Sequence, residues 1–280
     1  MIQLSPHRRP AAPHWFTPGS PGPASLPEHV EASGVGAWWA DRDRDPRAVA
    51  VACAGHVLLS GDPGGVAPDL LAPFAHSHVE TPARFLPVLG AAFDRLVPTE
   101  RMVYVHCEPV EPPRLKRSVT IRRLEPTDAP ALAALSPDSA WIHASWGGPE
   151  GLAASGHGFA AFDRDGGVAA VACGYFVGRT YEDVAVLTTP ERRRERLGLA
   201  CVTALCADIA ARGRTASWSC GRDNRPSRLL AWTAGFRLRR EYVQYVTGNP
   251  IARLLPGVPA PVSPAAQPIA TAPEPSLTGL

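Results

Sequence analysis

The clearest alternation of apolar and polar positions lies in the second half of the chain. Residues 118–124 (SVTIRRL) alternate as a half-buried strand does, and Thr127 and Asp128 supply helix-start chemistry for the stretch PTDAPALAAL. Two apolar runs, residues 157–163 (HGFAAFD) and 167–178 (GVAAVACGYFVG), flank the turn-forming DRDGG sequence. They predict a pair of strands joined by a tight turn.

The same half continues with strands and helices in alternation. YEDVAVLTT (181–189) predicts a strand, residues 198–213 a helix, ASWSC (216–220) a short strand and RPSRLLAWTAGF (225–236) a second helix. FRLRREYVQYV (236–246) predicts one or two final strands. This order indicates a mixed α/β fold in which crossover helices allow parallel pairing in part of the sheet.

The first half predicts a smaller α/β unit. Residues 48–61 (AVAVACAGHVLLSG) indicate one strand or a pair, residues 83–97 a helix, and residues 101–109 (RMVYVHCEP) another strand. The sequence divides into a Pro-rich N-terminus (1–28), this N-terminal unit (29–109), a linker (110–117), a C-terminal domain (118–248) and a Pro/Ala-rich tail (249–280). The composition of the tail is typical of disorder.

Composition and charge exclude several function classes. The net charge is +2, which argues against non-specific nucleic-acid binding, and Lys116 is the single lysine. A Walker-type phosphate site needs a Gly-Lys-Ser/Thr sequence and a Schiff-base enzyme needs a buried lysine, whereas Lys116 lies in RLKRS within the linker.

No secretory signal or membrane span is recognised, so we expect a cytoplasmic protein with no membrane partner and with reduced cysteines. The six cysteines form no C-x-x-C pair. His76 and His78 could ligate a metal, but neighbouring histidines are more often surface residues, and we expect no metal.

An arginine-rich loop, TTPERRRERLGLA (188–200), separates the predicted strand 181–189 from the predicted helix 198–213. Small residues at Gly198 and Ala200 would let a ligand approach the backbone, and the free amides of a helix start attract anions. Two readings are open. The loop is either an anion cradle or a basic, solvated first turn.

A second motif, NRPSRLLAWTAGF (224–236), lies one strand further along the chain. Together the two motifs resemble those of the GNAT superfamily of acyl-CoA-dependent N-acetyltransferases, over about residues 118–248. The resemblance implies a GNAT-like mixed central sheet flanked by helices, with acetyl-CoA as co-substrate.

Carried onto this chain, the family's R/Q-x-x-G-x-G/A turn falls on Glu195, Gly198 and Ala200, with Leu199 between the two small residues. Glu195 departs from the pattern, because its charge would repel a phosphate if it pointed inward. The cation would then come from a neighbouring arginine, with Glu195 turned outward; the candidates are Arg193, Arg194 and Arg196.

The resemblance also implies cofactor contacts outside the loop. Backbone groups of Val186 and Thr188 would meet the pantetheine arm, and Asn224 and Ser227 would support the cofactor side of the cleft. Asn224 is equally suited to capping the following helix, and the two roles are compatible.

Acetyl transfer to an amine needs a base and a proton donor for the departing thiolate. Glu182 and Asp183 are the candidate bases, unless they only form a solvated strand start; Glu182 is favoured for its longer side chain. The tyrosine that many GNAT enzymes carry four residues before the Gly-Phe pair is replaced by Ala231. Tyr242 or Tyr245 could substitute, although framework packing suits both, and Cys220 reads as a buried thiol.

These residues lead to two main hypotheses. The first is an N-acetyltransferase that moves an acetyl group from acetyl-CoA directly to a primary amine of a small molecule or peptide. The alternative is a non-catalytic acyl-CoA-binding or regulatory module on the same fold, favoured by Glu195 and by the missing tyrosine. Nucleic-acid binding through RRRER is weaker, since the run lacks interleaved aromatic residues for base stacking. The oligomeric state is not determined by the sequence.

Overall fold

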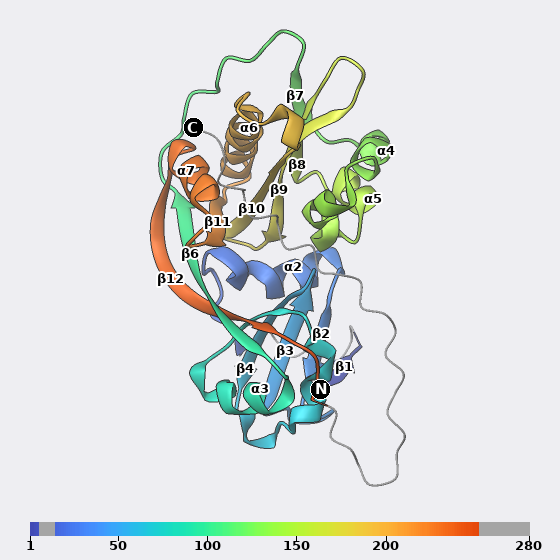
Figure 1. Cartoon of the computed structure of the whole chain (residues 1–280), viewed down its shortest axis with the longest axis vertical. Coiled ribbons are helices and arrows are strands. Elements are labelled where there is room, and N and C mark those ends of the chain that lie inside the picture. The colour runs from blue at the N-terminus through green and yellow to red at the C-terminus, as the bar shows by residue number, and fades with distance from the viewer. Residues whose placement is uncertain (6–14, 252–280) are drawn as a thin grey trace.

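The computed structural model describes residues 1–5 and 15–251, and the predicted disordered tail therefore lies almost wholly outside the described residues. The strands of these described residues form one 12-stranded sheet with the order β1-β2-β3-β4-β5-β12-β6-β11-β10-β9-β8-β7 (Figure 1). The strands are β1 (Ile2–Leu4), β2 (Ala37–Ala40), β3 (Ala48–Cys53), β4 (His56–Gly61), β5 (His78–Glu80), β6 (Leu96–His106), β7 (Thr120–Arg123), β8 (Gly158–Phe162), β9 (Val168–Val177), β10 (Tyr181–Thr188), β11 (Thr215–Gly221) and β12 (Phe236–Thr247).

Helices connect and cover these strands. The α-helices are α2 (Leu26–Ser33), α3 (Leu86–Ala92), α4 (Ala129–Ala133), α5 (Pro149–Ala154), α6 (Leu197–Ala211) and α7 (Arg225–Thr233). The 3₁₀ helices are η2 (Gly22–Ser25), η3 (Pro63–Gly65), η4 (Pro68–Phe74), η5 (Ala83–Phe85), η6 (Pro126–Asp128), η7 (Pro137–Trp146) and η8 (Pro190–Arg192). The predicted helix at 83–97 is shorter than expected, because Phe93 is already extended and strand β6 begins at Leu96.

The C-terminal half has the predicted mixed α/β architecture. Strands β7 to β10 are antiparallel in sequence order, and α6 then crosses over so that β11 pairs parallel to β10. The N-terminal half repeats part of this plan, since β2, β3 and β4 are antiparallel and β5 is parallel to β4. Its β4–β5 connection carries only short 3₁₀ helices where the C-terminal half has the long helix α6.

The two halves exchange their last strands. Strand β6, which follows β5 in the chain, lies between β11 and β12, and β12 lies between β6 and β5. Both strands are long and run through both halves of the molecule (Figure 1). A boundary at residues 110–117 therefore separates two stretches of the chain but does not interrupt the sheet.

The apolar core lies on both faces of this sheet. On one face, called here the α6 face, Leu197, Cys201 and Leu205 of α6 pack against Val184 and Trp218. The opposite face, called here the α2 face, is covered by α2, α4, α5 and η7. A third cluster lies under α3 and η4 in the N-terminal half. These two named faces separate the candidate functional residues.

Candidate active site

Strands β10 and β11 pair along only part of their length. The parallel register runs from Tyr181 opposite Thr215 to Val184 opposite Trp218. Beyond that point β10 continues to Thr188 alongside β9 alone, while β11 continues alongside β6. The stretch that holds Val186 and Thr188 therefore has an edge without a strand partner, and its backbone groups are available to a ligand.

The N-terminus of α6 follows this open edge after a strained loop. Arg194 and Arg196 have φ angles of 64° and 62°, a region that non-glycine residues rarely occupy and that is concentrated at functional sites. No side chain of the described residues caps α6, so the backbone amides of Leu197, Gly198 and Leu199 are free to bind an anion, whereas the Ala200 N–H already donates to Arg196 O at 3.1 Å.

Gly198 brings the helix close to the open strand. A Cβ atom at this position would lie 2.9 Å from Thr188 Oγ1, 3.5 Å from Val186 Cγ2 and 3.6 Å from Leu230 Cδ2 of α7. The glycine therefore allows α6, β10 and α7 to meet at one point.

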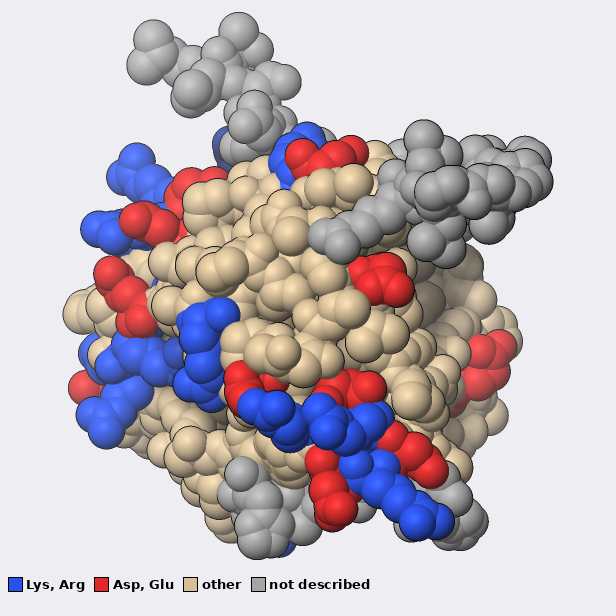
Figure 2. Space-filling view, turned by 90° about the horizontal axis from the view of Figure 1, so that it is seen from below, with Lys and Arg blue, Asp and Glu red and all other residues tan. Residues whose placement is uncertain are grey.

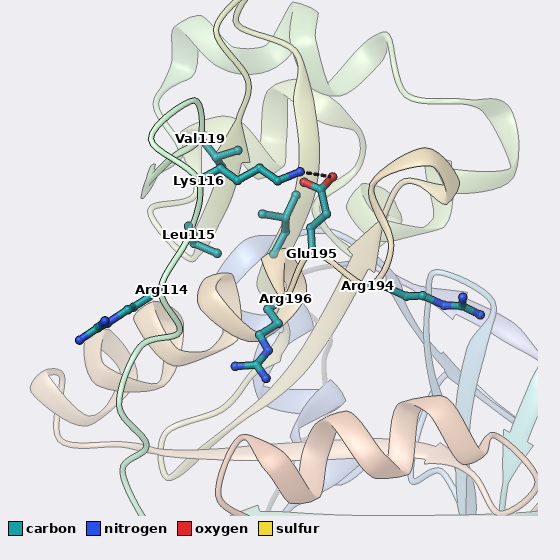
Figure 3. A pocket seen from close by; sticks show the side chains of 8 residues that line it. Arg114, Leu115, Lys116, Val119, Arg194, Glu195 and Arg196 are labelled. Carbon is teal, nitrogen blue, oxygen red and sulfur yellow. Dashed lines mark hydrogen bonds and ion pairs between the residues drawn. The ribbon is translucent and has the colours of Figure 1, made fainter.

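Glu195 is neutralised by two cations, of which Figure 3 shows Lys116. Its carboxylate lies 3.1 Å from Arg192 Nη2 and 3.3 Å from Lys116 Nζ of the linker, and these hydrogen bonds lower its pKa. Glu195 and Lys116 line a cavity of about 300 Å³ between the linker and the arginine-rich loop. Arg196 extends away from this ion pair in Figure 3.

The three candidate phosphate ligands Arg193, Arg194 and Arg196 are exposed. Within residues 1–5 and 15–251, no carboxylate lies within ion-pair distance of any of them. They are therefore free to meet an anionic ligand.

Asn224 and Ser227 have structural partners in the described fold. The Asn224 side chain accepts a hydrogen bond of 3.1 Å from the backbone N–H of Ser227, which caps α7. The Ser227 hydroxyl accepts a hydrogen bond of 3.0 Å from Trp218 Nε1. The capping role is observed, and the cofactor contact of both residues stays a prediction.

Glu182 lies in a buried ionic cluster. Its carboxylate is fully buried and accepts hydrogen bonds from Arg212 at 2.9 Å, Arg214 at 3.0 Å and His157 at 3.1 Å. Burial favours the neutral acid, but the His157 hydrogen bond and the neighbouring charges outweigh it and lower the pKa of Glu182. A carboxylate held by three donors near the end of α6 is a weak base.

Asp183 faces the opposite side of the sheet, as the strand alternation predicts. Its Oδ1 atom accepts hydrogen bonds of 3.1 Å from both Ser217 and Ser219 of β11. Burial raises the pKa of Asp183 to about 6, although the two hydroxyls and nearby arginines oppose that shift. Asp183 lies one residue before the last β10–β11 pair, where the strands begin to separate.

Tyr242 lies on the α2 face of β12, opposite Arg101 of β6. Its hydroxyl is buried without a hydrogen-bond partner, and burial raises its pKa, so the phenol stays protonated. Tyr245 has the opposite strand parity. Cys220 is buried on the α6 face with a raised pKa, which makes it a poor nucleophile.

The histidines of the N-terminal half show no metal site. His78 stacks on His56 with ring centroids 5.2 Å apart, and its Nδ1 atom lies 3.1 Å from Gln244 Nε2. The part of the chain that the structure describes contains no group of three His, Cys, Asp or Glu side chains arranged to hold a metal.

The sequence led us to expect that residues 29–109 shape one wall of the acceptor cleft, but it did not identify which residues of that half approach the site. Arg101 and Glu80 are within electrostatic reach of Tyr242, and Arg101 is also within reach of Asp183, because β5, β6 and β12 are adjacent. The sequence pointed to one part of this site: Ser217 and Ser219 of β11 alternate with the buried Trp218 and Cys220, so they lie on the opposite face of the sheet.

The outer surface gives no sign of a large single-charge patch on the face in Figure 2, where basic and acidic side chains are interleaved beside uncharged surface. Among the helices in residues 1–5 and 15–251, none is both long and apolar enough to cross a membrane.

Comparisons with known proteins agree with this architecture. The family model described as GNAT acetyltransferase matches residues 111–245. A protein of Streptomyces virginiae, described as an uncharacterized N-acetyltransferase in the mutA 5′ region, is 81% identical over 212 residues, which cover 76% of this chain and 90% of that protein.

Two solved structures share the fold at low sequence identity. A GCN5-related N-acetyltransferase-like protein from Streptococcus suis superposes with a TM-score of 0.59 at 18% identity, over 76% of this chain and 88% of that one. A tandem GNAT protein from the clavulanic acid biosynthesis pathway superposes with a TM-score of 0.56 at 12% identity, over 87% of this chain and 96% of that one. With the separated β10 and β11 strands and the uncapped α6, these matches show that the chain belongs to the GNAT acetyltransferase family.

Proposed function

We propose that this protein is an N-acetyltransferase that moves an acetyl group from acetyl-CoA to a primary amine by direct transfer. The observation that carries the proposal is the separation of β10 from β11 beside the uncapped N-terminus of α6, with Asp183 at the point of separation. Family membership makes the chain a transferase of this class; the donor and the amine acceptor are our inference.

The residues around the open edge suit a CoA-type co-substrate, which would supply the acetyl group as a thioester. First-turn amides of α6 and the unpaired arginines of the loop would bind the pyrophosphate. Glu195 does not oppose this role, because Lys116 and Arg192 already balance its charge. The open edge of β10 would bind the amide groups of the pantetheine arm.

We assign the general base to Asp183 in place of Glu182. A general base needs a lone pair that is available to accept the proton of the substrate. The carboxylate of Glu182 already accepts hydrogen bonds from three side chains. Asp183 is bonded only to two hydroxyls, and a pKa of about 6 makes it a better proton acceptor than an ordinary aspartate near neutral pH. Ser219 could relay the proton from the substrate, since its hydroxyl donates a hydrogen bond to Asp183 Oδ1.

Tyr242 is poorly placed to protonate the thiolate. It lies on β12, and β6 and β11 stand between its backbone and the open edge of β10 that would hold the pantetheine arm, whereas its phenol lies within electrostatic reach of Asp183. We therefore assign Tyr242 to the acceptor side.

Ala231 is fully buried and offers no proton donor, an observation that favours the second candidate, a non-catalytic acyl-CoA-binding module.

A two-part measurement on the full-length chain tests the proposal. Calorimetry measures acetyl-CoA binding, and thiol release against a panel of amines measures transfer, for the wild type and for Asp183→Asn. We expect acetyl-CoA affinity to be the same in both and kcat of the variant to fall by ~10²-fold, the usual contribution of a positioned base. Binding without thiol release from any amine would favour the non-catalytic module instead.

A further inference from the structure

Polar side chains from both halves of the molecule lie on the α2 face, with Val103 and Val105 of β6 among them. Asp183 lies opposite Ser217, Ser219 lies opposite Val103, and Arg101 lies opposite Tyr242 in the register of the sheet. Alternate residues of a strand project to the same face, so the polar residues of β10, β11, β6 and β12 share one surface. Glu80 of the neighbouring strand β5 extends the set through its contact with Arg240 of β12.

Several atoms of this set are buried without any hydrogen-bond partner. They are Arg101 Nε, the Tyr242 hydroxyl and Glu80 Oε2; among the described residues none of them makes a hydrogen bond of normal geometry, although Arg101 lies close enough to the Tyr242 hydroxyl to lower its pKa. Buried polar atoms in proteins are normally paired, and three unpaired ones within electrostatic reach of one another indicate a place for a polar ligand.

Two charged groups of the set make no direct ion pair, although Arg101 lies within electrostatic reach of both Glu80 and Asp183. Arg240 contacts Glu80 at 3.3 Å, but no carboxylate of residues 1–5 or 15–251 lies within ion-pair distance of Arg101. Asp183 is likewise bonded to serines rather than to a cation. The Arg101 guanidinium and the Asp183 carboxylate therefore lie on one face of the sheet, on β6 and β10 with β11 between them, and within electrostatic reach of each other.

We propose that the acceptor is a small molecule of the amino-acid class, whose amino group binds at Asp183 and whose carboxylate binds Arg101 and the Tyr242 hydroxyl. The proposal rests on the proposed acetyl transfer and names its substrate class. A guanidinium binds a carboxylate through two parallel N–H donors, and a protonated phenol adds a third. A diamine or polyamine fits less well, because its second ammonium would meet Arg101.

The surroundings favour a free small molecule over a long peptide. The start of η2 covers the Asp183 end, where the backbone N–H of Gly22 donates a 3.0 Å hydrogen bond to Ser217 Oγ. A Cβ atom on Gly22 would lie 2.9 Å from Ser219 Oγ, so this cover is in close contact. Arg101, Glu80 and Tyr242 form the other end; each residue is half-buried, with part of its side chain at the surface and the unpaired polar atom buried.

The reaction then balances without a further reactant. The bound ammonium gives one proton to Asp183, the amine nitrogen forms a bond to the thioester carbonyl carbon, and the carbon–sulfur bond breaks to release the thiolate. The nitrogen then loses its second proton, the thiolate takes up one proton to become the thiol, and Asp183 returns its proton to solvent. The products are an N-acetyl amino acid, the CoA thiol and one proton.

Matched substrates and variants test the carboxylate contact on the full-length protein. L-amino acids and their carboxamides have the same amine and nearly the same size, and they differ in the negative charge. We expect kcat/KM with acetyl-CoA to be at least about tenfold higher for the free acids, since charge-assisted hydrogen bonds are lost in the amides. Arg101→Gln should lower kcat/KM for the acids by about 10- to 100-fold and change that for the amides by less than about twofold.

The control is Arg222→Gln, an exposed arginine paired with Glu100 and Glu241 outside this set. It should leave the acid-to-amide ratio unchanged. Equal rates for acids and amides, or an equal loss for both in Arg101→Gln, would overturn the substrate class while leaving acetyl transfer intact.

Calorimetry with the amino acids alone separates the two proposals. Binding that depends on Arg101 supports the acceptor site even if no amine is acetylated, in which case the proposed transfer fails. Absence of amino-acid binding, together with acetylation of other amines, contradicts the acceptor site alone.

Discussion

Replacement of Glu182 by glutamine is expected to lower the free energy of unfolding without abolishing acetyl transfer. Glutamine keeps the shape of the side chain but removes the charge that Arg212, Arg214 and His157 share. Its NH₂ group would also place N–H donors where the carboxylate oxygen had accepted hydrogen bonds from these cations.

The size of the effect follows from the burial of the partners. Removal of one member of a fully buried ion pair costs ~3–5 kcal/mol. The side chains of Arg212 and Arg214 retain 26% and 30% of their exposure, so water replaces part of what they lose. We therefore expect a loss of roughly 2–3 kcal/mol, or ~4–12 °C in Tm at ~2–4 °C per kcal/mol for a chain of this size.

Urea denaturation and a thermal melt measure this loss, and thiol release measures activity in the same samples. Leu229→Ala, on the exposed face of α7, is the control variant, and we expect little change in its stability. Unchanged stability of Glu182→Gln combined with a ~10²-fold lower kcat would refute the reasoning and return the role of base to Glu182.

The pH dependence of this variant has a definite sign. Because folding lowers the pKa of Glu182, its charge stabilises the fold above the unfolded value of ~4.3, and this contribution disappears as the pH falls through the lower folded value. The stability difference between wild type and variant should therefore narrow below about pH 4.

Three further predictions concern activity, the cofactor and the strand exchange. The kcat profile of the wild type should lose activity as the pH falls through about 6, the value that burial gives Asp183, and a flat profile between pH 5 and 8 would contradict this base. Replacement of Arg193, Arg194 and Arg196 together by alanine should weaken acetyl-CoA binding by at least ~10-fold in calorimetry with an unchanged melt, whereas equal affinity would remove the loop from the cofactor site. The fragment 118–248 lacks β6, so the facing edges of β11 and β12 lose their shared partner, and circular dichroism should show an unfolded or aggregated chain; a cooperative monomeric melt would show that the exchange is dispensable.

The sequence by itself determined the C-terminal architecture and the family. Alternating apolar positions predicted β7 to β12, and the helix signals predicted α6 and α7, because both patterns depend on local periodicity and on local backbone chemistry. The pair of loop motifs identified the GNAT resemblance, since both depend on short spacings that remain visible along the chain.

The assignment of the candidate base needed the tertiary structure. The alternation of side chains along β10 predicted that Glu182 and Asp183 face opposite sides of the sheet. It did not indicate that Arg212 and Arg214 lie on the side of Glu182 and the β11 serines on the side of Asp183. Side-chain length favoured Glu182, whereas the observed partners favour Asp183, because occupied lone pairs and burial decide basicity.

The acceptor region also depended on contacts between distant parts of the chain. Arg101 and Glu80 belong to a half in which the sequence showed no catalytic constellation, and the exchange of β6 and β12 brings them next to Tyr242. Sequence patterns report which face of an element is apolar. Which strands become neighbours is decided by the packing of the whole sheet, and here that packing places charges from both halves on one surface.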